Sequence, residues 1–222
     1  MSSILYRINK VLSHMVTGVP IGTNLGLFHL LWMLLSGRLL QSRGAVIPGL
    51  ADLGLAADAV RRSWAALAYG KWQAQQLLRA WEPLVREEGR FQAHQYGGYR
   101  PVACDVVGFF RPRLQACPTQ HDSSTAGKAF PAILVGIAAR VGSVGMQRLA
   151  VPCLLVRSEG TDASEATLQT HLLHKVQAQL ADDEAVVCDR GFPLMQIQAA
   201  GILRYVSRGP INCTARRAVL PA

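Results

Sequence analysis

The sequence predicts an α/β protein with two parts, a helical region at 1–99 and a mixed sheet with helices at 100–222. Apolar residues recur at three- and four-residue spacing in the first part, whereas short apolar runs typical of strands begin at residue 101. Gly97, Gly98 and Pro101 mark a boundary between the two patterns. With 222 residues, half of them apolar, the chain can bury a sizeable core.

The first part is predicted to form a helical bundle. Helices are expected at 3–16 and 24–42, and a third helix is expected through 71–87, where two tryptophans would anchor it. The second helix contains an apolar run at 26–35, which is about half of the roughly 20 residues that a membrane-spanning helix needs. We therefore interpret this run as a buried helix and expect no membrane partner.

A helix-turn-helix pattern is predicted at 45–64, where Gly54 separates two short helical segments. Arg61 and Arg62 in the second segment would then face away from the bundle and could meet DNA phosphates or base edges. The alternative is an ordinary helical hairpin with a solvated arginine pair, since such short patterns have low specificity. Three side chains of the second helix are expected to point inward: Val60, Trp64 and Leu67.

The charge balance favours a polyanionic partner such as nucleic acid. The formal net charge is +9 and the isoelectric point is near 9.8, with lysines and arginines spread along the chain. Basic composition alone does not establish nucleic-acid binding, because many small proteins share it.

The five cysteines favour a reducing environment, because they are odd in number and include no Cys-x-x-Cys pair. Three of them lie in apolar, strand-like runs, which indicates buried free thiols. Arg7 and Lys10 interrupt any N-terminal signal peptide. We therefore expect a cytoplasmic location.

The second part of the chain is predicted to alternate strands and helices after an antiparallel meander. A long polar loop is expected at 111–130. The other predicted elements are strands at 101–107, 131–140 and 149–157, a helix opened by the segment Asp162–Glu165, a strand at 185–189, a helix at 193–200 and a strand at 202–206.

Two aspartates, Asp105 and Asp189, lie in or at the end of apolar strand patterns in this second part. If the first and fourth strands are neighbours in the sheet, their carboxylates come together and could share a divalent cation. The alternative for either residue is an aspartate that only closes a strand. Asp122 is a rival ligand in the predicted loop, although a loop positions a carboxylate less firmly.

This order of elements resembles the ribonuclease H-like catalytic domain of DDE transposases from bacterial insertion sequences. Asp189-Arg190-Gly191-Phe192 resembles the second-aspartate motif of that family, and Asp105 with the Val-Val-Gly-Phe-Phe that follows resembles the first. The resemblance covers roughly 100–208. The helical 1–99 is similar to the N-terminal DNA-binding regions of such enzymes.

The resemblance implies a metal-dependent DNA strand cleavage and transfer reaction in DNA transposition. Asp105 and Asp189 would be the catalytic metal ligands, and the cofactor would be Mg²⁺ or Mn²⁺. The implied partner is double-stranded DNA at transposon ends. A bacterial, nucleoid-associated location and a homodimer in the active parent belong to the same expectation. Apart from the resemblance, Lys128 and Arg140 are cationic residues that could contact a DNA backbone.

One part of the family pattern has no counterpart here. The family's third acid, a glutamate on a later helix, is absent, since 190–222 contain neither Asp nor Glu. The resemblance therefore predicts the front portion of a transposase, shortened before the third acid and inactive by itself. An incomplete ribonuclease H-like sheet is the fold that this implies.

Two other functions compete with this prediction. A non-catalytic DNA-binding protein derived from a transposase would keep the helical region alone, and a metal-dependent nuclease would share the sheet. His171 and His174 are a weak metal-binding pattern because no third ligand is near in the sequence. The segment 123–128 lacks the spacing of a phosphate-binding loop, so nucleotide binding is not predicted.

Overall fold

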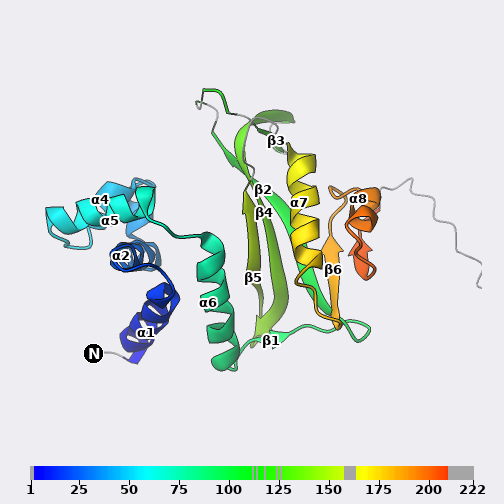
Figure 1. The fold of residues 1–222 in the computed structure, drawn as a ribbon, viewed down its shortest axis with the longest axis horizontal. Coiled ribbons are helices and arrows are strands. Elements are labelled where there is room, and N and C mark those ends of the chain that lie inside the picture. The colour runs from blue at the N-terminus through cyan, green and yellow to red at the C-terminus, as the bar shows by residue number, and fades with distance from the viewer. Residues whose placement is uncertain are drawn as a thin grey trace, which may run out of the picture. The chain divides into compact units, whose positions relative to one another are not determined.

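The chain divides into two units, Met1–Gly89 and Arg90–Ala222, in the computed structural model shown in Figure 1. The structure describes residues 3–111, 113, 115–117, 119–123, 125, 127–157 and 164–209. The boundary at Gly89 precedes the predicted one at residue 99. The reason is that Gln92 and Ala93 already pair with the sheet, opposite Ser143 and Gly142.

The first unit is helical, as predicted. One predicted helix, 24–42, is divided in two because Gly37 adopts a left-handed conformation with φ of 74°. Gly54, with φ of 76°, lies in the turn between the two helices of the predicted helix-turn-helix. The helices are α1 (Ser3–Thr17), α2 (Asn24–Leu35), α3 (Arg38–Gln41), α4 (Val46–Ala51), α5 (Ala57–Tyr69) and α6 (Ala74–Glu87).

Helices α2 and α5 approach each other closely at Gly26. A Cβ atom at this position would lie 2.4 Å from the Cβ of Ala66, so only glycine allows the contact. Beside it, His29 Nδ1 and Ser63 Oγ are 2.9 Å apart, and burial lowers the pKa of His29. Ser63 is therefore part of the helix interface.

The prediction that Trp64 points inward is wrong, since this side chain is 39% exposed. Helix α5 instead packs through Val60, Ser63 and Ala66, which recur every three residues. This row faces the close contact at Gly26, which turns the neighbouring Trp64 outward. The contact with α2, which the sequence pattern does not reveal, thus determines the buried face of α5.

The second unit is an open mixed sheet whose central strand is β2. Strand β2 pairs antiparallel with β4 and parallel with β6, and β6 pairs parallel with β7. Strand β5 pairs antiparallel with β4. The strands are β1 (Gln92–Ala93), β2 (Arg100–Phe110), β3 (Gln120–Ser123), β4 (Lys128–Val144), β5 (Gln147–Arg157), β6 (Glu184–Cys188) and β7 (Tyr205–Ser207).

This topology confirms two predictions from the sequence. The strands predicted at 101–107, 131–140 and 149–157 form the antiparallel meander of β2, β4 and β5, and the strand predicted at 185–189 lies beside the first. The predicted loop at 111–130 is wrong in part, because β3 and the start of β4 form a hairpin within it.

Two helices, α7 (Glu165–Gln177) and α8 (Leu194–Ala199), belong to this unit. Ser164 is the N-cap of α7, and its hydroxyl accepts a hydrogen bond of 3.1 Å from the Thr167 amide. Asp162 of the predicted capping segment lies outside the described residues. The helix begins at the predicted segment, but Glu165 is its first residue and therefore does not occupy the third helical position that a capping box requires.

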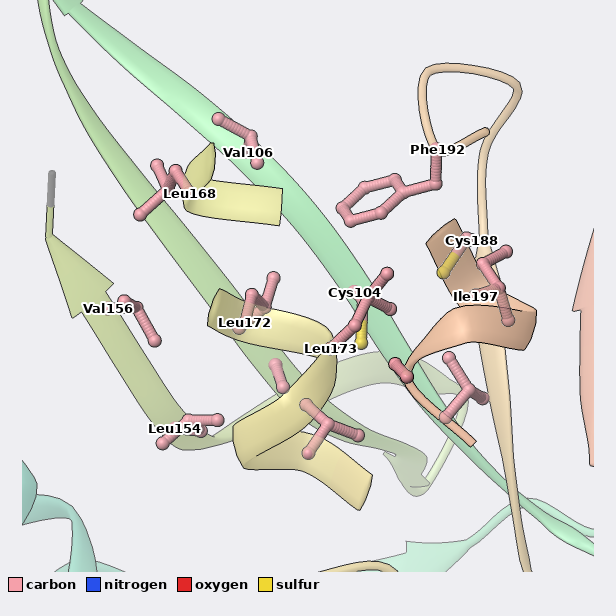
Figure 2. Close-up of a cluster of buried hydrophobic side chains, with 14 of the residues drawn as sticks. Cys104, Val106, Leu154, Val156, Leu168, Leu172, Leu173, Cys188, Phe192 and Ile197 are labelled. Carbon is pink, nitrogen blue, oxygen red and sulfur yellow. The ribbon is translucent and has the colours of Figure 1, made fainter. Parts of the chain in front are cut away.

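The core of the second unit lies between the sheet and these helices (Figure 2). Leu168, Leu172 and Leu173 of α7 share this core with side chains from four strands. Each strand contributes alternate residues, because residues two apart on a strand point to the same face. Phe192 and Ile197 extend this core beyond the end of β6. The strand residues in the core include Val102, Cys104, Val106, Leu134, Ala138, Leu154, Val156, Val186 and Cys188.

None of the described helices is long and apolar enough to cross a membrane.

Candidate functional site

Two neighbouring strands position Asp105 and Asp189: Asp105 lies within β2, and Asp189 directly follows β6. The parallel pairing of β2 with β6 ends at the pair Cys104 and Cys188, and each aspartate is the next residue along the chain. Neighbouring strands lie about 4.8 Å apart, so the backbones of the two aspartates start within the span of one cation site. The sheet thereby brings together the two residues that the sequence singled out.

Both aspartates are exposed, whereas the cysteine before each is buried. Because side chains alternate between the faces of a strand, Cys104 points into the core and Asp105 points to the opposite face. The main chain of Asp105 lies opposite Ile137 of β4. Asp189 comes directly after the last residue of β6 and is exposed as well.

The turn after β6 explains the Asp-Arg-Gly-Phe motif. The amide of Gly191 donates a 2.8 Å hydrogen bond to Asp189 Oδ1, and Phe192 is buried in the core. A Cβ atom on Gly191 would lie 3.0 Å from that same oxygen, which favours glycine. Gln169 of α7 donates to the Gly191 carbonyl at 3.1 Å. Two hydrogen bonds and the buried Phe192 ring thus fix the turn, and the turn orients the Asp189 carboxylate.

The Asp105 carboxylate is oriented by its own strand, since the amide of Val106 donates to Asp105 Oδ1 at 2.8 Å. At both aspartates a backbone amide holds Oδ1, and no described residue donates a hydrogen bond to Oδ2. Two carboxylates with accessible oxygens are donors that suit Mg²⁺ or Mn²⁺. Within the described residues, no group of three or more His, Cys, Asp or Glu side chains is placed to hold a metal.

Beneath the aspartates, Cys104 and Cys188 form a buried pair of free thiols. The hydrogen bond with Cys188 and burial together raise the pKa of the Cys104 thiol. Figure 2 shows both sulfur atoms among the apolar side chains of the core. The prediction of buried free thiols is confirmed for these two cysteines, whereas Cys153 is half-buried and Cys213 lies outside the described residues.

The two arginines of the predicted helix-turn-helix lie on the exposed side of α5. Arg61 is 79% exposed and forms a 3.1 Å ion pair with Asp58, one turn earlier in the same helix. Arg62 is exposed as well. Such a surface ion pair contributes little to stability, so Arg61 can exchange Asp58 for another anion.

Lys128 and Arg140, the two other predicted DNA contacts, have different surroundings. Lys128 is exposed at the start of β4, and its Nζ lies 5.0 Å from the centre of the Phe130 ring. Arg140 is half-buried, and its Nε donates to Glu184 at 2.6 Å. DNA contact by either residue stays a prediction, and Arg140 already has a structural partner.

The remaining polar candidates lie elsewhere on the second unit. Asp122 belongs to β3, opposite Ala129 in the β3–β4 hairpin. His171 and His174 are exposed on α7. The sequence reasoning missed the contact of His121 Nδ1 with Glu165 Oε2 at 3.0 Å, which joins β3 to the start of α7. No signal in the sequence relates these two residues, because 44 positions separate them.

No protein-family model matches the chain, and neither does any curated protein.

Proposed function

We propose that the chain is a DNA transposition protein of the DDE type. In this proposal the first unit binds double-stranded DNA, and the second unit is a ribonuclease H-like domain whose Asp105 and Asp189 hold a divalent cation. One observation carries the proposal: these two aspartates directly follow Cys104 and Cys188, the last pair of the parallel ladder between β2 and β6. The basic charge of the chain agrees with a DNA partner.

The order of the strands supports a ribonuclease H-like fold. The sheet runs from β5 through β4, β2 and β6 to β7, and a helix connects the meander to β6. This is the order of elements on which the resemblance to DDE transposases rests. The first acid lies within the first strand of that order, and the second follows the fourth strand.

The chemistry assigned to this site needs carboxylate oxygens in fixed positions. The Val106 and Gly191 amides hold one oxygen of each carboxylate, so the other oxygen of each can face a ligand. A Mg²⁺ or Mn²⁺ ion bound there would lower the pKa of an attacking water or 3′-hydroxyl and stabilise the leaving oxygen of a DNA phosphodiester. Asp105 and Asp189 would hold that ion and thereby position the scissile phosphate.

In the first unit, Arg61 and Arg62 would bind DNA phosphates. Both side chains are exposed, and they follow each other on a helix whose opposite side packs against α2. The preceding helix α4 and the turn at Gly54 give the pair the order of a helix-turn-helix. Lys128 is proposed as an additional backbone contact on the second unit because its ammonium group is exposed.

A binding function without catalysis is the second candidate, and one observation favours it. Residues 190–222 contain no Asp or Glu that could act as a third acid. Two carboxylates can hold one ion, whereas the two-ion mechanism implied by the resemblance requires more oxygen ligands. This candidate shares the DNA-binding surface and the single cation site with the first.

Paramagnetic relaxation by Mn²⁺ tests the metal centre. NMR signals from residues near Cys104 and Cys188 should broaden on titration with Mn²⁺ in the parent chain. The variant Asp189→Asn should require a much higher concentration of the ion, because it removes one charged ligand. Asp182→Asn is the matched control, since Asp182 is an exposed aspartate elsewhere on the same unit. Equal broadening in the parent and in Asp189→Asn would reject the site.

A further inference from the structure

We propose that the sheet face carrying Asp105 also binds unpaired DNA, with Phe109 as a base-stacking residue and Arg111 as a phosphate contact. This inference rests on the proposed function, because it adds a path for one strand beside the same metal centre. It gives Phe109 and Arg111 roles that the resemblance does not assign to them.

Strand alternation places Asp105, Val107 and Phe109 in one row on the face opposite α7. The ladder continues one step further, since the Arg111 amide donates to the Pro131 carbonyl at 2.7 Å. Phe109 is four residues from Asp105 and Arg111 is six, so they lie about 13 Å and about 20 Å from it along the strand. The row therefore leads away from the proposed scissile phosphate in a straight line.

Phe109 differs from the phenylalanine next to it. Phe110 points to the other face, where its ring centre lies 5.9 Å from that of His121 and 6.1 Å from that of Phe130. Phe109 is 50% exposed, and among the described residues no ring contact involves it. Its neighbour in the row, Val107, is 36% exposed. An exposed phenylalanine in an apolar strip beside a candidate site is a feature of binding surfaces.

The charge at this end of the sheet is complementary to a nucleic acid. Between residues 109 and 130 the sequence holds three cationic residues, Arg111, Arg113 and Lys128, and one acid, Asp122. All four side chains are exposed. Glu165, the acid that α7 brings to this end, contacts His121 at 3.0 Å. A positive surplus around an exposed aromatic ring is the combination that single-strand binding sites use.

The proposed partner is unpaired DNA because an exposed aromatic ring can stack only on a base whose face is accessible. In a duplex both faces of each base are stacked on neighbouring bases, so a side chain on an open sheet cannot cover them. In a single strand the base faces are free, and an aromatic side chain can stack on any of them. Phe109 would supply that platform, and Arg111 would neutralise a neighbouring phosphate.

The test is binding of a fluorescein-labelled oligothymidylate of about 12 nucleotides to the full chain, followed by fluorescence anisotropy. No divalent cation is added, so the metal centre plays no part. Phe109→Ala should raise the Kd roughly tenfold, and Phe109→Tyr should preserve it, because tyrosine keeps the ring. Tyr96→Ala, which removes a 64% exposed ring on the same unit, is the matched control and should leave the Kd unchanged.

A second variant tests the phosphate contact. Arg111→Ala should reduce the slope of log K against log salt concentration by about 0.7, the value expected for one single-strand phosphate contact. An unchanged Kd in Phe109→Ala, or a parent chain that does not bind the oligothymidylate at low salt, overturns the inference. If Phe109→Ala alters only the mass measured by light scattering, the face binds a second copy and the inference is also overturned.

These outcomes are separate from those of the Mn²⁺ experiment. If Asp189→Asn weakens Mn²⁺ binding but Phe109→Ala leaves the oligothymidylate Kd unchanged, the proposed metal centre is supported and the proposed single-strand path is rejected. A chain with Phe109-dependent binding and no Asp189-dependent Mn²⁺ site would support the strand path and reject the metal centre.

Discussion

Arg140 and Glu184 form an ion pair across the sheet, with Nε and Oε1 2.6 Å apart, although their strands β4 and β6 are separated by β2. The Glu184 side chain is 1% exposed. Its other oxygen accepts a 3.0 Å hydrogen bond from the Ala181 amide, and Arg100 lies 3.8 Å away. This pair joins the antiparallel and parallel halves of the sheet at the first residue of β6, the strand that Asp189 follows.

Breaking this pair should destabilise the second unit. Glu184→Gln leaves the half-buried Arg140 without its counter-charge, so we expect the free energy of unfolding to fall by roughly 3 kcal/mol. Hydrogen exchange of the β2 and β6 amides measures this fall in the free energy of unfolding, because both strands belong to the second unit. Asp183→Asn is the control: it breaks the pair of the exposed Asp183 with Arg100 and leaves the charges around Glu184 in place, so it should cost much less stability. Similar losses in both variants would contradict the structural role of Glu184.

The same pair should make stability depend on pH. Burial by itself would raise the pKa of Glu184, but the hydrogen bonds from Arg140 and the Ala181 amide and the charges of Arg140 and Arg100 outweigh it and hold the pKa below 4.5. A carboxyl group with a lowered folded-state pKa stabilises the fold above its unfolded pKa, and this contribution is lost as the pH falls through the folded-state pKa.

The difference in free energy of unfolding between the parent and Glu184→Gln should therefore be largest above pH 4.5 and shrink below it. Denaturant titrations at about pH 6 and about pH 3.5 measure the two ends of this window. A difference that stays constant between these pH values would show that Glu184 does not titrate as its surroundings require.

Gly26 should be intolerant of the substitution that normally strengthens a helix. Gly→Ala within a helix usually stabilises by up to about 1 kcal/mol. At Gly26 the added Cβ would meet Ala66 at 2.4 Å, so we expect Gly26→Ala to destabilise the first unit by about 1–3 kcal/mol. All four tryptophans lie in this unit, so tryptophan fluorescence during urea denaturation reports on it.

Gly18→Ala is the control for this prediction, because a Cβ there meets nothing within 4 Å. A double variant, Gly26→Ala with Ala66→Gly, should recover part of the loss by removing the opposing methyl group. If Gly26→Ala raises the denaturation midpoint, α2 and α5 do not approach as closely as described.

DNA binding by α5 should depend on salt through its arginines. Replacing Arg61 and Arg62 by Ala should weaken binding to duplex DNA and reduce the slope of log K against log salt by up to about 1.8, since each phosphate contact contributes about 0.9. Anisotropy titrations at several salt concentrations give the slope. The matched control replaces Arg7 and Lys10 by Ala. Both residues are exposed on α1, and their replacement removes the same net charge from the chain. Equal slopes in the two double variants would reject a specific role for α5.

Strand cleavage should be undetectable with this chain alone. Asp105 and Asp189 can hold one ion, and 190–222 offer no further acid to hold a second. A supercoiled-plasmid assay with Mg²⁺ or Mn²⁺, comparing the parent with Asp105→Ala, measures this. Robust cleavage that disappears in Asp105→Ala would show that an acid from elsewhere, such as Asp122 or one of a partner subunit, completes the site.

Much of the sheet could be predicted from local patterns. Apolar runs of strand length located β2, β4, β5 and β6, because a strand buried on one or both faces needs such residues. The position of β6 beside β2 followed from the rules of strand connection. The β3–β4 hairpin was missed, since its residues are polar and its pairing comes from β4, which extends further than its apolar run.

The sequence alone determined that the strands carrying or preceding Asp105 and Asp189 are neighbours, because hydrophobic spacing and chain connectivity are local properties that a sequence carries. Only the tertiary structure decided which side chains became partners. Trp64 turns outward because α2 meets α5 at Gly26, and Arg140 binds Glu184 across an intervening strand. These contacts join residues far apart in the sequence, and they form only once the helices and strands have packed in three dimensions.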